Sequence, residues 1–333
     1  MAVAIGRRQF IVALGGAAVA WPIAAHAQRG GGLRLLGVLV HGVQTDPGWQ
    51  RRVEAFRQGL EEIGWLEGRN IHIEWRFSAN NFNRLSQLAQ EIVALNPDVI
   101  FVNTTPATKA LQQEAHSIPV IFVQVSDPVG SGIVASLARP GGNITGILLY
   151  EDSIVGKWLG MLKEIAPRLT RVAFVGTPKG FSYNYLLRTA NVIAPSLGIE
   201  MVPTPVENAA DIEKSIESFA HTPNGGLFFP PDNLIEENRE LVIALAARNR
   251  LPAVYAYREF VAAGGLMFYG TDLVAQFRQS ALYVDRVLRG ASPADLPVQA
   301  PTKYETVFNL KTAKALGFDV PPTLLVRADE VIE

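Results

Sequence analysis

The chain has 333 residues, with 30 basic and 31 acidic side chains, a formal net charge of −1 and no cysteine. The absence of cysteine excludes disulfides, thiol catalysis, thiolate metal sites and a lipid-modified cysteine, and the balanced charge provides no electrostatic footprint for nucleic acid or an anionic membrane. Single cores stop growing at about 250 to 300 residues, so this length predicts two domains.

Residues 1–27 have the order of an export signal. Arg7 and Arg8 precede an apolar run rich in glycine and alanine, which ends at Ala25-His26-Ala27. This order of charged, apolar and small residues predicts cleavage after Ala27, and the run is too short to span a membrane stably. The arginine pair resembles the twin-arginine signature, which favours that route over the general one. We expect a soluble periplasmic protein.

From residue 33 onward, strand-like and helix-like segments alternate. The predicted strands lie at 33–40, 70–77, 98–103 and 118–123, and again at 171–176, 199–204, 225–230 and 252–256. Amphipathic stretches with apolar spacings of three and four separate them. This alternation predicts right-handed βαβ units, and therefore an α/β fold of two Rossmann-like lobes with parallel sheets, joined near residues 147–152.

One glycine pattern suggests a dinucleotide site. Gly130, Gly132 and Ala135 spell G-x-G-x-x-A after an apolar run. A dinucleotide fingerprint needs a strand that leads almost directly into the first glycine and a long helix that opens at the turn. Here Ser126-Asp127-Pro128 intervenes and any helix is limited to about 133–138, so a surface loop is the better interpretation.

Other catalytic patterns are incomplete. Ser182 lies in a near match to G-x-S-x-G, but Asn184 replaces the last glycine and only His221 follows. The five histidines stand singly, which indicates surface or hydrogen-bonded histidines rather than a metal site. We therefore expect no metal, no cofactor and no catalytic residue.

Small polar and aromatic residues gather at the predicted strand ends. In parallel α/β sheets, ligands bind outside the carboxyl ends of the strands. An alternative role for some of these residues is to cap the helices that follow, without contacting a ligand. This alternative applies to Thr105, Asp232 and Asn233. The candidate ligand-binding residues are Gln44, Thr104, Thr105, Ser126, Asp127, Phe181, Tyr183, Asn184, Asp232, Asn233 and Tyr257.

The chemistry of these candidates indicates a solute class. Their aromatic rings can hold a flat group, and helices that begin near Thr105 and Tyr183 would direct N–H groups at a carboxylate. Asp232 is the candidate for an ammonium group. We expect a small carboxylate-bearing solute, an amino acid first and an aromatic acid second.

Three segments resemble a known family: SDPVGSGIVASLARPGGNITG at 126–146, PPDN at 230–233, and LPVQAPTKYETVFNLKTAKALGFDVPPTLLVRADEVIE at 296–333. They are similar to the ABC transporter solute-binding proteins of the tryptophan-binding-protein-like group. The resemblance implies a type I periplasmic binding fold, no enzymatic activity, and delivery of the solute to a membrane permease. It also implies an N-terminal lobe of 33–149 plus 271–289 and a C-terminal lobe of 150–270 plus 298–333, joined by hinge strands.

Two alternatives stay open. The same fold could serve as a ligand-binding sensor that feeds a receptor, and an exported α/β hydrolase is the candidate from another class. For the solute-binding protein, a monomer without a nucleic-acid partner is expected.

Overall fold

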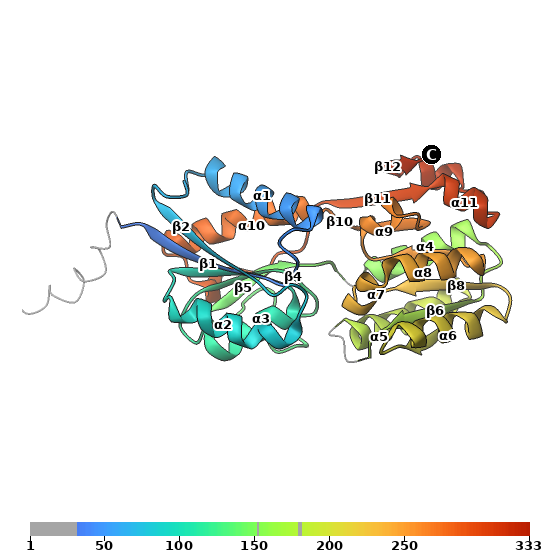
Figure 1. Ribbon diagram of the computed structural model, residues 1–333, viewed down its shortest axis with the longest axis horizontal. Coiled ribbons are helices and arrows are strands. Elements are labelled where there is room, and N and C mark those ends of the chain that lie inside the picture. The colour runs from blue at the N-terminus through green and yellow to red at the C-terminus, as the bar shows by residue number, and fades with distance from the viewer. Residues whose placement is uncertain (1–31, 152, 179–181) are drawn as a thin grey trace, which may run out of the picture.

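The computed structural model describes residues 32–151, 153–178 and 182–333. Two α/β lobes lie side by side along the long axis of the molecule (Figure 1), which confirms the predicted fold class. The proposed export signal at 1–27 falls outside the described residues. Within the described residues, every helix is too short or too polar to cross a membrane.

The sheet of the N-terminal lobe has five parallel strands in the order β2-β1-β3-β4-β5. Its central strands are almost wholly apolar, as expected for strands covered on both faces. The strands are β1 (Arg34–Val40), β2 (Ile71–Phe77), β3 (Val99–Asn103), β4 (Val120–Val125) and β5 (Ile144–Leu148).

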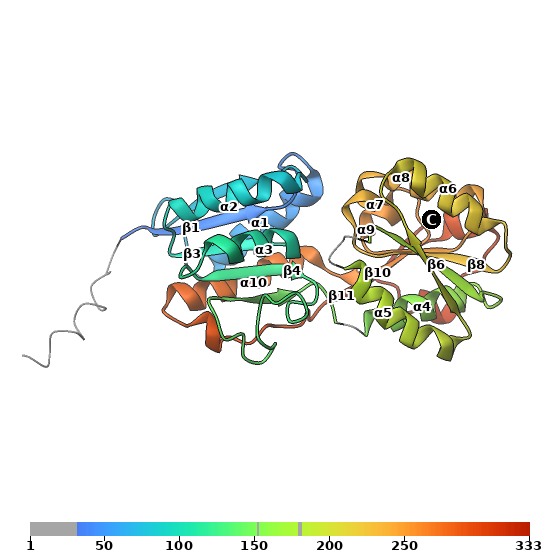
Figure 2. The same cartoon turned by 90° about the horizontal axis from the view of Figure 1, so that it is seen from below.

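Helices cover both faces of this sheet (Figure 2). On one face, α1 and α10 pack around Phe56, Phe101 and Phe277; on the other, α2 and α3 bury Leu88 and Leu111. The helical elements of this lobe are α1 (Pro47–Glu62), η2 (Phe82–Arg84), α2 (Leu85–Ala94), α3 (Thr105–Glu114), α10 (Leu273–Leu288) and η4 (Pro293–Asp295).

The sheet of the C-terminal lobe has the order β12-β11-β10-β9-β8-β6-β7. Neighbouring strands are parallel except for the antiparallel pair β10 and β11. The strands are β6 (Arg171–Gly176), β7 (Glu200–Pro205), β8 (Gly225–Phe229), β9 (Ala253–Tyr255), β10 (Met267–Thr271), β11 (Tyr304–Asn309) and β12 (Glu330–Ile332).

Two large apolar clusters form most of the core of this lobe, one on each face of the sheet, and Val261, Phe268 and Val307 form a small third cluster. Trp158 of α4 and Leu186 of α5 belong to one cluster, and Ile216 of α6 and Leu245 of α8 belong to the other. The helical elements are α4 (Ile154–Ile165), α5 (Tyr183–Ile193), η3 (Ala194–Leu197), α6 (Ala209–Ala220), α7 (Asn233–Glu237), α8 (Arg239–Arg248), α9 (Arg258–Ala262), α11 (Leu310–Leu316) and α12 (Pro322–Leu325).

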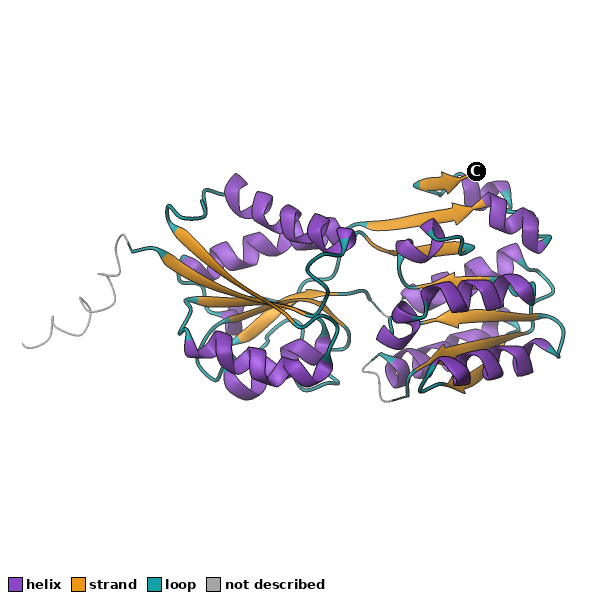
Figure 3. Cartoon of the chain, viewed as in Figure 1, coloured by secondary structure: helices purple, strands orange, loops and turns teal. Residues whose placement is uncertain are grey.

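The chain passes between the lobes at three places, after β5, after β10 and before β11 (Figure 3). The last passage is tied to the N-terminal sheet, because Gln299 pairs with Ile147 and its N–H donates to the carbonyl of Gly146. Two of the three connections therefore adjoin β10 and β11, which pair with each other in the C-terminal sheet.

The loop after β4 contains no helix, including over 133–138, the stretch to which the sequence limited any helix. The N–H groups of Ile133 and Val134 both donate to the carbonyl of Pro128, and Gly132 has a φ of 68°. These bonds fold the segment back as consecutive turns, which agrees with the interpretation of the glycine pattern as a surface loop.

Candidate functional site

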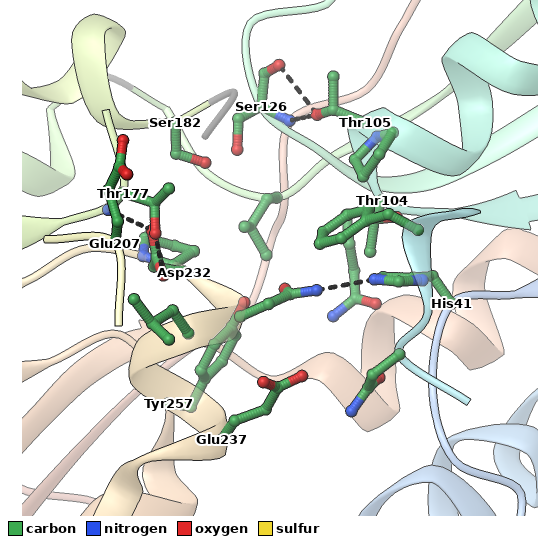
Figure 4. A pocket seen from close by; sticks show the side chains of 18 residues that line it. His41, Thr104, Thr105, Ser126, Thr177, Ser182, Glu207, Asp232, Glu237 and Tyr257 are labelled. Carbon is green, nitrogen blue, oxygen red and sulfur yellow. Dashed lines mark hydrogen bonds between the residues drawn. The ribbon is translucent and has the colours of Figure 1, made fainter. Parts of the chain in front are cut away.

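A cavity of about 500 Å³ lies between the two lobes, at the carboxyl ends of their strands (Figure 4). We call its two sides the N-lobe wall and the C-lobe wall. The N-lobe wall includes His41, Phe82, Thr104, Thr105, Gln124 and Ser126. The C-lobe wall includes Thr177, Glu207, Asp232, Asn233, Glu237 and Tyr257. The carboxyl ends of parallel strands lie at one edge of a sheet, where ligands bind. These edges of the two lobes face each other across the cavity.

Thr104 and Thr105 place the start of α3 on the N-lobe wall. Thr104 has φ 70° and ψ 152°, a region that is essentially restricted to glycine, and its side chain does not cap α3. Its Oγ1 is buried with no hydrogen-bond partner among the described residues. The N–H groups of a first helical turn lack intrahelical acceptors. The wall therefore combines an uncapped helix start with an unused hydroxyl.

The hydroxyl of Thr105 is already engaged. Its Oγ1 accepts from the Ser126 N–H at 3.1 Å and donates to the Ser126 carbonyl at 3.4 Å. This pair of bonds ties the start of α3 to the end of β4. Thr105 therefore positions the N-lobe wall as well as lining it.

Gln124 is a lining residue that the sequence reasoning missed. It has a φ of 58° at an irregularity in the pairing of β4 with β5, and its Oε1 accepts from Asn103 Nδ2. Positive φ values at residues other than glycine are uncommon and concentrate at functional sites. A lone amide within the apolar segment IPVIFVQV was the signal that could have identified it.

His41 is buried on the N-lobe wall and reaches across to the C-lobe wall. Its Nε2 lies 2.7 Å from Asn233 Nδ2, and its Nδ1 lies 2.6 Å from Ser78 Oγ. An amide NH₂ can only donate, so Nε2 accepts and Nδ1 carries the proton. Burial lowers the pKa of His41 to about 4, so the ring is neutral near pH 7. It therefore adds no positive charge to the cavity.

Asp232 organises the C-lobe wall. Its carboxylate accepts from the Thr177 N–H at 2.7 Å, from Thr177 Oγ1 at 3.2 Å, and from the Ile235 N–H at 3.2 Å. The last bond caps α7. Asp232 thus holds the loop after β6 against the helix that carries Asn233.

An ion pair also joins the lobes beside the cavity. Arg52 of α1 contacts Glu259 of α9 at 3.1 Å, and its guanidinium lies 4.5 Å from the ring centre of Trp49. Burial, with a contribution from Glu259, raises the pKa of Glu236 on α7 to about 7, while Arg52 opposes the rise. Sequence patterns alone could not pair these residues, because they lie on different lobes.

The structure brings six of the predicted site residues together at the cavity: Thr104, Thr105, Ser126, Asp232, Asn233 and Tyr257. It places four others elsewhere: Gln44, Asp127, Tyr183 and Asn184. Phe181 lies outside the described residues. The four residues away from the cavity each have a local explanation.

Tyr183 belongs to the core because α5 buries the stripe of Tyr183, Leu186 and Ala190, and its ring packs on Phe174. Asn184 is exposed on α5 and donates to the Pro178 carbonyl. Their positions follow the helical period rather than the nearby strand end.

Asp127 and Gln44 stabilise or border loops instead of the cavity. Asp127 accepts from the Gly130 N–H at 2.7 Å, which closes the turn after β4. Gln44 is exposed in the loop before α1, in a separate depression near Arg76 and Phe77.

Phe82 is the aromatic residue that the sequence reasoning missed. It is half exposed, lines the cavity, and its ring centre lies 4.6 Å from that of His41. It lies a few residues before α2 and does not follow a strand directly. The pattern of polar and aromatic residues at strand ends therefore did not include it. With Tyr257 on the other wall, it provides a flat apolar surface on each side.

The residues 32–151, 153–178 and 182–333 contain no group of three or more His, Asp or Glu that could hold a metal ion. Among the described residues that line the cavity, the charged side chains are those of Glu207, Asp232 and Glu237. The N-lobe wall offers neutral donors and the C-lobe wall offers carboxylates.

Comparisons with known proteins agree with this architecture. A tyrosine-binding protein of Clostridioides difficile is 26% identical over 270 residues, which cover 81% of this chain and 77% of that protein. A conserved domain protein of Vibrio cholerae is 27% identical with a TM-score of 0.83, over 90% of this chain and all of that one. An ABC domain in complex with L-Trp from Streptococcus pneumonia is 22% identical with the same TM-score and the same coverage.

The family model described as ABC transporter substrate binding protein matches residues 38–332, which include all the walls of the cavity. Proteins of this family bind small solutes for an ABC transporter and are not enzymes. This chain belongs to the ABC transporter substrate binding protein family.

Proposed function

We propose that the protein is the periplasmic binding component of an ABC import system and that its cavity holds an amino acid with a flat side chain. The observation that carries the proposal is the chemical polarity of the cavity: neutral donors and an uncapped helix start on the N-lobe wall face carboxylates on the C-lobe wall. A zwitterion matches both walls at once.

The carboxylate of the solute is assigned to the start of α3. First-turn N–H groups and the positive end of the helix dipole favour an anion there, and the free Thr104 Oγ1 adds a donor. Within the part of the chain that the structure describes, these neutral groups are what the N-lobe wall offers to a carboxylate.

The flat side chain is assigned to the space between Phe82 and Tyr257. Stacking on a ring contributes about 0.5 to 1.5 kcal/mol beyond area burial. A volume of about 500 Å³ falls within the range of small-molecule sites. The tyrosine-binding relative supports an aromatic amino acid as the first class to test.

The direct test is a thermal-shift screen of the purified protein with aromatic amino acids, aliphatic amino acids, aromatic acids, purines and sugars, followed by calorimetric titration of the hits. A ligand at 100 times its Kd adds about 2.7 kcal/mol of stability, which gives a clear shift. We expect the largest shifts with aromatic amino acids. Stabilisation by sugars without any response to amino acids would contradict the proposal.

Export belongs to the same proposal. Residues 1–27 have the features of a signal peptide, and we expect mass spectrometry of the periplasmic fraction to find a mature terminus at Gln28. A full-length chain retained in the cytoplasm would contradict it. Export of a variant with Arg7→Lys and Arg8→Lys would identify the general route rather than the twin-arginine route.

A further inference from the structure

Among the described residues that line the cavity, the charged side chains are acidic. These side chains are the carboxylates of Glu207, Asp232 and Glu237, and His41 is neutral near pH 7. Carboxylates of this kind repel an anionic group of a solute and attract a cationic one. The cavity therefore favours a solute with a cationic group, and the three carboxylates differ in how free they are to bind it.

Asp232 is the most heavily committed of the three. It accepts three hydrogen bonds from Thr177 and Ile235, all within its own lobe. Moving its carboxylate toward a solute would uncap α7 and release the loop after β6. Asp232 is therefore a positioning residue for the C-lobe wall.

Glu207 is also engaged, since it takes part in a further interaction. In Figure 4 it lies beside Thr177, on the far side of the cavity from His41. A cationic group of the solute bound beside Glu207 would lie away from His41 and Asn233, whose hydrogen bond joins the two lobes.

Glu237 is different. Its carboxylate accepts no hydrogen bond and forms no ion pair with any residue in the described ranges, although it lines the cavity. It follows Asn233 by four residues on α7, so both side chains lie on one face of that helix. Figure 4 shows it close to Tyr257 and near the bond between Asn233 and His41, where the lobes meet.

We propose that Glu237 binds the cationic group of the solute and makes the site selective for amines over their deaminated analogues. This inference rests on the proposed function and names the residue that recognises the ammonium group. Hydrogen bonds to a charged group contribute more than neutral ones, and closure of the lobes would remove the carboxylate from water only when a cation compensates it.

The test compares two isosteric variants, Glu237→Gln and Glu240→Gln. Glu240 is an exposed carboxylate three residues further along the chain, on α8, and it does not line the cavity. Each protein is titrated by calorimetry with L-tyrosine, with 3-(4-hydroxyphenyl)propionate, which lacks the amine, and with tyramine, which lacks the carboxylate. Equal melting temperatures of the free proteins show that both variants fold.

We expect Glu237→Gln to bind L-tyrosine and tyramine at least tenfold more weakly than the unaltered protein, and to bind the deaminated acid equally or better. Glu240→Gln should bind all three within twofold of the unaltered protein. If Glu237→Gln binds L-tyrosine with unaltered affinity, this inference is overturned while the proposed function stands.

The remaining outcomes separate the two proposals. If tyramine binds, L-tyrosine does not, and Glu237→Gln weakens tyramine, the assignment of Glu237 holds and the carboxylate site at α3 is wrong. If the unaltered protein binds none of the three compounds and no other amino acid, both proposals are overturned.

Discussion

The two walls of the cavity are built by different means. The N-lobe wall is made of uncharged side chains, of which His41, Thr105, Gln124 and Ser126 are buried, and Thr104 and Gln124 have positive φ values. The C-lobe wall is acidic, and the five-residue helix α7 carries much of it. Among the described residues, one wall is therefore neutral and hydrogen-bonded, and the other provides the charged side chains.

The largest predicted effect comes from His41 on the neutral wall. Its pKa falls from 6.5 to about 4 on folding, so between these values the unfolded chain binds a proton that the folded protein does not. Stability should therefore fall as the pH drops from 6.5 to 4, by about 1.4 kcal/mol per unit and about 3 kcal/mol in all. Urea unfolding across this range measures the slope.

The variant His41→Gln should lose this component of the slope, whereas His116→Gln, an exposed histidine outside the cavity, should keep it. Equal slopes for His41→Gln and the unaltered protein would show that the ring is not held neutral, and the contrast between the walls would then be smaller than the structure indicates.

The second effect has the opposite sign and belongs to α7. The pKa of Glu236 rises from 4.5 to about 7, so the folded protein holds a proton that the unfolded chain releases in this range. The contribution of Glu236 to the free energy of unfolding is fully present below pH 4.5 and is lost as the pH rises through 7. Because Glu236 is partly exposed and lies near Arg52, we expect about 1 to 2 kcal/mol.

Glu236→Gln should therefore stabilise the protein at pH 8 and have little effect at pH 5, as measured by urea unfolding at both values. An equal gain at the two pH values would indicate a packing effect instead of titration. A loss at pH 8 would show that the ionised carboxylate is needed beside Arg52.

The third prediction separates capping from solute binding on the acidic wall. Asp232→Ala removes the cap of α7, and Asn208→Ala removes the equivalent cap of α6, which does not line the cavity. Each should lower the free energy of unfolding by about 1 kcal/mol. Only Asp232→Ala should also weaken solute binding, by at least tenfold in calorimetry, because it releases Thr177 and α7. Equal affinities in the two variants would place the solute away from this wall.

The smallest predicted effect concerns the ring of Phe82, which lines the cavity. Phe82→Ala should weaken binding of an aromatic solute by about 0.5 to 1.5 kcal/mol, up to roughly tenfold, with little change in melting temperature because the ring is half exposed. Phe82→Leu keeps an apolar side chain and should recover only part of the affinity. Full recovery in Phe82→Leu would indicate area burial rather than stacking.

Much of the architecture could be predicted from the sequence, because the alternation of strands and helices is a local property. Apolar runs such as VIFVN of β3 and the amphipathic period of α1 depend on residues close along the chain. The carboxyl ends of the strands also indicated part of the cavity, since Thr104 and Ser126 follow β3 and β4 directly and Asp232 lies three residues after β8. The sequence alone therefore determined the fold class and the edge at which the site lies.

Only the tertiary structure decided which side chains face the cavity and what charge they carry. Tyr183 was placed in the core by the helical stripe of α5, and Phe82 came to the cavity through contact with His41. The bond between His41 and Asn233 joins residues 192 positions apart on different lobes. Burial and hydrogen bonding between distant residues set the neutral state of His41 and the raised pKa of Glu236, and no local pattern contains that information.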